Sequence, residues 1–249
     1  MKRLITGLTL ASVVLAAGIY EANARPPYAA KEQKPCGYCH VNPAGGGPRN
    51  FRGQFYGANG LSFELFNEDR EAALAHVVSG SNGDDSIAKG AYIASVTAPA
   101  DRAITGRTNM SPVLVVFLNN TADDATKTAV KTLGKISDAY GRGLAVVGVI
   151  EGDRETALKL TSDLGNVIRI LPDVEGAAMK KYKGQMGFDM ALVPKFDQND
   201  TPPIGYYQGF SKQTIEKIID SLGNQGVSGK TVDTADISPK PLRGAKLGG

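Results

Sequence analysis

One unbroken apolar stretch decides the fold of the larger part of the chain: Val113-Leu114-Val115-Val116-Phe117-Leu118. Such a run predicts a strand that is buried on both faces, as in a parallel sheet. Runs of the same kind cover Leu144 to Ile150 and Val167 to Leu171. Segments with helical spacing of apolar residues lie between these runs, the first at residues 125–140. This alternation predicts a mostly parallel sheet covered by helices.

The sequence after this alternation predicts a closing hairpin and a last helix. Two further strand patterns, near Met190 to Phe196 and Ile204 to Gln208, flank the turn-rich residues 199–203. Ser211 is a typical N-cap for a helix that runs to Leu222. The fold class is therefore mixed, with a small and mainly α-helical segment followed by an α/β domain. Residues 225–249 are rich in Gly, Ser, Pro and Lys, so we expect a disordered tail there.

Composition excludes several classes of protein. The 249 residues are 42% hydrophobic and 21% charged, which is a globular profile. The net charge is +3 and no basic stripe is present, so we expect no nucleic-acid partner. The chain has only two Cys and two His, which leaves very few ligands for any metal chemistry.

The first 24 residues have the pattern of a secretory signal peptide. Lys2 and Arg3 precede an apolar stretch from Leu4 to Ile19, and Ala22-Asn23-Ala24 provides the small residues of a cleavage site. The alternative is an uncleaved membrane anchor, which the short and interrupted apolar stretch disfavours. We expect a periplasmic or extracellular protein with no transmembrane segment after cleavage.

The motif that carries chemistry is Cys36-Gly37-Tyr38-Cys39-His40. C-x-x-C-H is the attachment pattern of c-type haem. Two thiols three positions apart reach the two vinyl groups at one edge of the porphyrin, and His40 follows as the proximal iron ligand. We therefore predict one covalent haem c, bound through Cys36 and Cys39.

Three other interpretations of the motif stay open at this level. C-x-x-C is also a dithiol active-site pattern, but that motif normally follows a buried strand, and residues 30–35 do not predict one. The two Cys also allow a plain disulfide. With the two His they also allow a zinc site.

The residues that flank the motif fit a haem. Glycines in Pro43-Ala44-Gly45-Gly46-Gly47-Pro48 let the backbone pass close to a flat ligand, and the carbonyl of Pro43 or Pro48 is a candidate acceptor for the second ring N–H of His40. Arg49 is a candidate partner for a haem propionate, as is Arg52, with a solvated role as the alternative for both. Aromatic residues expected to form a small core follow closely: Phe51, Phe55, Tyr56, Phe63 and Phe66.

The sixth iron ligand has two candidates within the chain. His76 is the only other histidine and lies in a predicted helix that Asn67 caps and Gly80 terminates. Met110 is the second candidate. An open or externally supplied position is the third possibility. A bis-histidine iron has a lower potential than a His/Met iron.

Two resemblances follow from these residues. The N-terminal segment resembles the c-type cytochromes at Cys36 to His40, which implies single-electron transfer. Residues 112–223 resemble the thioredoxin-like proteins of the peroxiredoxin or thiol-disulfide reductase kind, from the order of residues 111–117, 146–150 and 170–173 and the join at 207–211. In that family paired Cys follow the first strand, whereas residues 119–125 here contain none. The family's cis-proline corresponds either to Val193-Pro194 or, with a shifted strand, to Ala191.

These expectations give five parts of the chain. They are a signal peptide (1–24), a haem-binding segment (25–80), a linker (81–111), a thioredoxin-like domain (112–224) and the tail (225–249). The leading hypothesis is an exported monohaem cytochrome that meets a redox partner protein and depends on haem-maturation machinery. We expect an electron carrier and not an enzyme, with peroxidase activity left open. The alternatives are a haem-based sensor of small ligands and a thiol-disulfide oxidoreductase that uses Cys36 and Cys39.

Overall fold

The computed structural model describes residues 27–81, 92–98, 100–105, 111–185, 187–194, 202–238 and 240–242. The predicted signal peptide lies outside these residues. The chain divides into two compact units, residues 1–35 and 36–249. Helix α2 (Pro27–Glu32) belongs to the first unit, and the structure discussed below belongs to the second. Within the described part of the chain, no helix combines the length and the apolar character that a membrane span requires.

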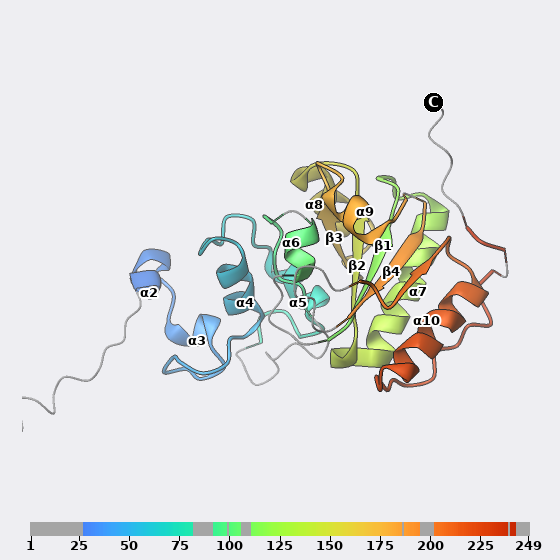
Figure 1. Cartoon of the computed structure of the whole chain (residues 1–249). Helices are drawn as coiled ribbons and strands as arrows, with labels where there is room; N and C mark the ends of the chain where they lie inside the picture. The colour runs from blue at the N-terminus through green and yellow to red at the C-terminus, as the bar shows by residue number, and fades with distance from the viewer. Residues whose placement is uncertain are drawn as a thin grey trace, which may run out of the picture. The chain divides into compact units, whose positions relative to one another are not determined.

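A five-stranded mixed sheet organises the second unit (Figure 1). Its strands are β1 (Val113–Phe117), β2 (Ala145–Ile150), β3 (Arg169–Pro172), β4 (Asp189–Val193) and β5 (Gly205–Tyr207). They lie in the order β3-β2-β1-β4-β5. The first three strands pair in parallel, and β4 pairs antiparallel with both β1 and β5. The predicted α/β sheet with a closing hairpin is confirmed.

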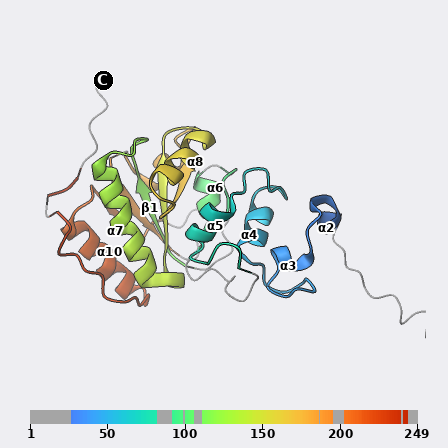
Figure 2. The ribbon, with the colours of Figure 1, turned by 180° about the vertical axis from the view of Figure 1, so that it is seen from behind.

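Helices cover both faces of the sheet because the central strands are buried on both sides. Leu114 and Val116 of β1 pack into a core with α7 (Asp124–Tyr140), α8 (Arg154–Asp163) and α10 (Lys212–Asn224). Figure 2 shows α7 in front of the sheet. Val113, Val115 and Phe117 pack into the opposite core with α6 (Ala100–Thr105) and α9 (Ala177–Tyr182). A short 3-10 turn, η1 (Gly141–Gly143), joins α7 to β2.

Side-chain caps begin the helices where the sequence predicts. The amide of Thr156 donates to Asp153 at 2.8 Å at the start of α8. The amide of Thr214 donates to Ser211 at 3.2 Å at the start of α10. Each cap satisfies one of the free N–H groups of a helix N-terminus.

The stretch predicted as a linker supplies part of the sheet's covering layer, so here the structure differs from the sequence prediction. Ala100, Ala103 and Ile104 of α6 are buried in the same core as β1. Residues 92–94 alternate between two cores. Tyr92 and Ala94 pack with Phe51 of the N-terminal segment, whereas Ile93 packs with the sheet.

The predicted disordered tail is also corrected by the structure, because residues between 225 and 242 make ordered contacts with the domain. The amide of Lys230 donates to the Ala139 carbonyl at 2.9 Å, and Leu242 and Phe210 exchange two backbone hydrogen bonds. Ile237 is buried against the core. This Gly- and Pro-rich segment is therefore an irregular chain that is held against α7 and α10 by backbone hydrogen bonds.

Three short helices form the N-terminal segment (residues 36–81). They are α3 (Cys36–Cys39), α4 (Phe51–Ala58) and α5 (Glu68–Leu74). Asn67 caps α5 as predicted, with its side chain accepting from the Arg70 amide at 2.9 Å.

A buried ion pair joins the N-terminal segment to the edge strand of the sheet. Glu71 of α5 and Arg169 of β3 form two hydrogen bonds, and both side chains are almost fully buried. Tyr92 donates to Glu71 at 2.5 Å, and the Arg169 Nε donates to the Ile93 carbonyl at 3.0 Å. Burial alone raises the pKa of Glu71, but the Arg169 charge and the hydrogen bonds hold that pKa below its usual value.

We expect Glu71→Gln to destabilise the protein by about 3–5 kcal/mol at pH 7, because Arg169 is left buried without its counter-charge. A lowered folded pKa means that the carboxylate stabilises the fold above about pH 4.3 and that this contribution is lost on further acidification. The gap between wild type and variant should therefore narrow in acid. Urea unfolding at several pH values measures both effects. Exposed Glu64→Gln is the matched control, and equal losses in the two variants would contradict the prediction.

Candidate functional site

The C-x-x-C-H motif forms a single helical turn. Helix α3 spans Cys36 to Cys39, and the His40 amide donates to the Cys36 carbonyl at 3.0 Å. Residues at i and i+3 share one face of a helix, so the two side chains project to the same side. Neither Cys is part of a disulfide, and both are partly exposed. The chain thus presents two thiols and the following histidine on adjacent backbone.

The motif is docked on the start of α4 through its backbone. The Asn50 amide donates to the Cys39 carbonyl at 3.0 Å, and the Asn50 side chain donates to the Tyr38 carbonyl at 2.9 Å. The same side chain accepts from the Gly53 amide and so caps α4. A Cβ on Gly53 would lie 2.1 Å from the Cys39 carbonyl oxygen, so only glycine permits this contact. The sequence analysis missed Asn50 and Gly53.

An aromatic cluster supports the turn, as the sequence predicts. The Phe63 ring contacts those of Tyr38, Tyr56 and Phe66, with centroids 5.5, 4.7 and 5.4 Å away. Phe66 also contacts Phe51 and Phe55. Tyr38 also belongs to this aromatic cluster, which the sequence did not predict. The position of an aromatic residue inside the motif could have indicated it. Through Tyr38 the motif becomes part of the core of its own segment.

Of the two arginines considered for haem propionates, Arg52 already has a carboxylate partner. It is buried and donates to Glu68 through Nε and Nη2, and these hydrogen bonds raise the pKa of Arg52. The Arg49 guanidinium lies over Gly57, where a Cβ would come 2.2 Å from its Nη1. The propionate role of Arg49 stays a prediction.

The glycine loop after the motif packs against Cys36, and the expected close approach to a flat ligand stays a prediction. Gly45 has a φ of +89°, and a Cβ there would lie 3.1 Å from the Cys36 Cβ and 3.4 Å from its sulfur. A side chain at this position would meet both backbone strain and the thiol.

One ring nitrogen of His40 is buried without a partner. Its Nδ1 has no hydrogen bond, and the Pro48 carbonyl, one of the two predicted acceptors, instead accepts from the Val41 amide at 3.1 Å. A buried polar atom without a partner costs about 1–3 kcal/mol, which is unusual for a histidine with no task. Two thiols on one turn, a glycine loop and a histidine directly after the turn are the groups that a covalently attached haem requires. Residues 36–40 are the donors that would hold it.

A zinc site is not supported by this part of the chain. Among the described residues, no three His, Cys, Asp or Glu are grouped so that they could hold a metal ion.

His76 does not lie in a helix, contrary to the sequence analysis. Helix α5 ends at Leu74, and His76 follows in the left-handed conformation with a φ of +55°. The His76 amide donates to the Ala73 carbonyl and the Val77 amide to the Ala72 carbonyl, which is a Schellman C-cap. Glycine usually occupies this position, and the predicted stop at Gly80 is four residues too late.

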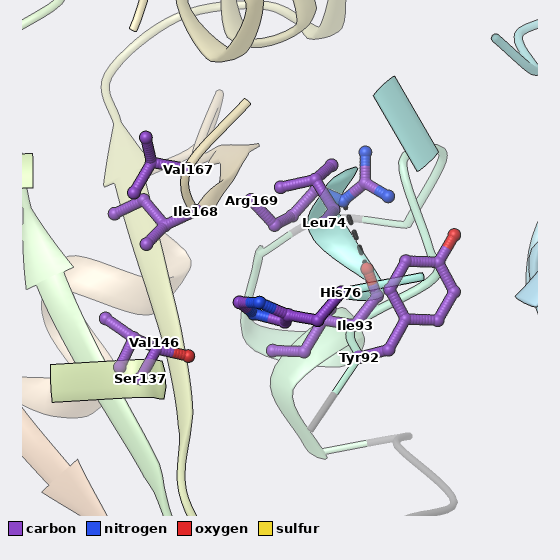
Figure 3. Close-up of a pocket in the computed structure, with 9 residues that line it drawn as sticks. All are labelled: Leu74, His76, Tyr92, Ile93, Ser137, Val146, Val167, Ile168 and Arg169. Carbon is purple, nitrogen blue, oxygen red and sulfur yellow. Dashed lines mark hydrogen bonds between the residues drawn. The ribbon is translucent and has the colours of Figure 1, made fainter. Parts of the chain in front are cut away.

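The His76 side chain contacts the sheet domain. Its Nδ1 lies 3.0 Å from the Asp138 carboxylate of α7. Figure 3 shows His76 in a pocket that it lines with Tyr92, Ile93, Ser137 and Arg169, among others, and no residue of the motif lines this pocket. Met110 lies outside the described residues. The sixth ligand stays a prediction for both residues.

The position that carries paired Cys in thioredoxin-like proteins is occupied here by a helix cap. Beyond β1, Asp123 accepts from the Thr126 amide at 2.7 Å, and these hydrogen bonds lower the Asp123 pKa. The register pairs Phe117, at the end of β1, with Asp189 at the start of β4. Of the two places considered for the family's cis-proline, Ala191 pairs with Val115 and Pro194 follows Val193, which pairs with Val113 at the start of β1, and the choice between them stays a prediction. The residue next to the end of β1 is Phe188.

Comparison with known proteins identifies no family. No protein-family model matches the chain, and no curated protein matches it. Solved structures that resemble it include an uncharacterized thioredoxin-like protein from Porphyromonas gingivalis (10% identity, 51% of this chain and 84% of that chain, TM-score 0.40). A putative thioredoxin from Neisseria meningitidis is 15% identical over 47% of this chain and 77% of that chain, with a TM-score of 0.38. A secreted Mycobacterium tuberculosis disulfide oxidoreductase homologous to E. coli DsbE is 11% identical over 47% of this chain and 83% of that chain, with a TM-score of 0.32.

The topology itself defines the class of the larger domain. Two parallel βαβ units, an antiparallel hairpin and a closing helix make a mixed α/β domain. Its two cores are complete without any cysteine.

We expect Gly53→Ala to weaken the docking of the motif, with a loss of about 1–3 kcal/mol, because the new methyl group meets a backbone carbonyl that cannot move aside. Gly57→Ala in the same helix is the matched control, since the methyl group meets only the mobile end of Arg49 and alanine favours a helix by about 1 kcal/mol. Denaturant unfolding of the two variants measures the difference. Equal stabilities would show that α3 is not seated on α4 as described.

Proposed function

We propose that residues 36–40 attach one haem covalently and that the protein is an exported monohaem cytochrome that transfers single electrons. The observation that carries the proposal is the single turn of α3, which places the two thiols on one side and is followed directly by His40.

Each residue of the turn has a defined role in this proposal. The Cys36 and Cys39 thiols form thioether bonds by addition of each S–H across a vinyl group. His40 would be the proximal ligand that holds the iron, and Arg49 would be the partner of a propionate. The bound haem supplies one-electron redox chemistry. The aromatic cluster holds the turn and limits access of water from the protein side.

The thioredoxin-like domain has a different role in the proposal, because it has no thiols. We assign to it the docking of a redox partner and the support of the N-terminal segment, which it contacts through Arg169. Haem-maturation machinery outside the cytoplasm attaches the haem in this scheme.

A second candidate function is thiol-disulfide exchange by Cys36 and Cys39. It is favoured by one observation, the presence of two partly exposed Cys, neither of them in a disulfide, three positions apart on a helix. The thiols lie outside the thioredoxin-like sheet, so this function would not use the site at the end of β1. A mature protein with two titratable thiols and no haem absorbance would establish it.

Co-expression with haem-maturation machinery should yield a protein whose haem absorbance survives denaturation. Because the haem is held by two thioether bonds in this proposal, Cys36→Ser with Cys39→Ser should abolish that absorbance. His40→Ala should keep the attached haem but lose its native axial ligation. Visible spectra before and after denaturation measure both. Val78→Ser at an exposed position is the control, and wild-type protein without covalent haem would overturn the proposal.

We expect His76→Ala to change the low-spin spectrum of the haem-loaded protein if His76 is the sixth ligand, since no other histidine is available. Spectra of the oxidised and reduced variant, together with Met110→Leu, distinguish the two candidates. An unchanged spectrum in His76→Ala would rule this histidine out. Carbon monoxide binding by the reduced wild type would instead indicate an open position and favour a sensor.

A further inference from the structure

The strongest feature beside the motif that the proposed function does not use is the buried side chain of Arg52. The residue lies in the first turn of α4 and is 4% exposed. Its guanidinium carbon lies 4.9 Å from the centroid of the Tyr38 ring and 4.8 Å from that of Phe51. A guanidinium between two aromatic rings is held by both cation–π attraction and packing.

Hydrogen bonds fix the other side of the same guanidinium. Glu68 accepts from Nε at 2.9 Å and from Nη2 at 2.5 Å, and the Ser81 carbonyl accepts from Nη1 at 3.2 Å. The two-pronged pairing with a carboxylate is specific to arginine, because the ammonium of lysine offers no planar fork. Glu68 is also held, since it accepts from the Gly80 amide at 3.2 Å. The side chain of Arg52 thus has one orientation, and the Tyr38 ring rests on it.

We infer that Arg52 is a positioning residue for the C-x-x-C-H turn, which it holds through Tyr38, and that it places a buried positive charge against the middle of that turn. This inference rests on the proposed function for the effect of the charge on a haem only. Tyr38 is the central side chain of the turn, between the two Cys, and its ring also contacts Phe63. The guanidinium stacks on the Tyr38 ring, so its charge lies next to the turn.

A charge in this place has a defined effect on an attached haem. Oxidation adds one positive charge to the iron, so a nearby cation disfavours the oxidised form and a nearby anion favours it. Arg52 therefore raises the reduction potential and Glu68 lowers it. Loss of either residue loosens the turn, but the two losses move the potential in opposite directions. A purely structural role would move it in the same direction in both variants.

The first experiment needs no haem. Amide hydrogen exchange is measured in the reduced, haem-free full chain at His40 and Asn50, the two amides that bond to the carbonyls of the turn. Arg52→Gln should speed exchange at both by about tenfold or more, because local opening becomes easier. Arg52→Lys should not restore protection. Arg70→Gln is the matched control, since Arg70 also pairs with a carboxylate of α5 but lies outside the turn.

The second experiment uses the haem-loaded protein. The midpoint potential should fall in Arg52→Gln and rise in Glu68→Gln. If Arg52→Gln does not fold, Glu68→Gln still decides, because it keeps the stacked guanidinium and must show a raised potential. Equal exchange in Arg52→Gln and Arg70→Gln would overturn the positioning role, and shifts of the same sign would overturn the charge effect. Absence of covalent haem in the wild type would overturn only the proposed function, because the exchange result stands without it.

Discussion

The second unit depends on one buried ion pair, between Glu71 of α5 and Arg169 of β3. Neither charge can be left in a protein interior without a partner, so each residue fixes where the other must lie. The pair also orders its surroundings, because Tyr92 completes the ligands of the carboxylate and the Ile93 carbonyl accepts from Arg169. The N-terminal segment is thus attached to the edge of the sheet by groups that tolerate little displacement.

Local sequence patterns predicted the parts of the structure that local physics determines. The apolar runs at residues 113–118 and 144–150 form buried strands because nothing in them suits a surface. Asn67, Asp153 and Ser211 begin helices because their side chains satisfy free amides. The spacing of Cys36, Cys39 and His40 follows from a single helical turn. Each of these features is contained in fewer than about ten neighbouring residues, so the sequence displays it directly.

Contacts between distant residues account for what the sequence did not reveal. Arg169 in an otherwise apolar strand was the one visible sign of a buried partner, but the identity of that partner depends on the fold. His76 takes a left-handed conformation in which glycine is usual, and its contact with Asp138 is tertiary. The polar composition of residues 225–242 indicates disorder, yet backbone hydrogen bonds to Ala139 and Phe210 hold this stretch in place. The register of β4 against β1 was equally hidden, because strand pairing depends on the whole sheet.

The two cores are sensitive to a change of chain length at residues 92–94, because successive side chains there enter different cores. Successive side chains of extended backbone point to opposite sides, so these residues serve the N-terminal core and the sheet core in turn. Insertion or deletion of a single residue here would exchange the two sets of side chains. Asn59 bonds to the Ala94 carbonyl and the Val96 amide and would lose its partners at the same time. Changes of chain length in this stretch are therefore compatible with the fold only in steps of two residues, so its length should vary far less than that of an ordinary connection between domains.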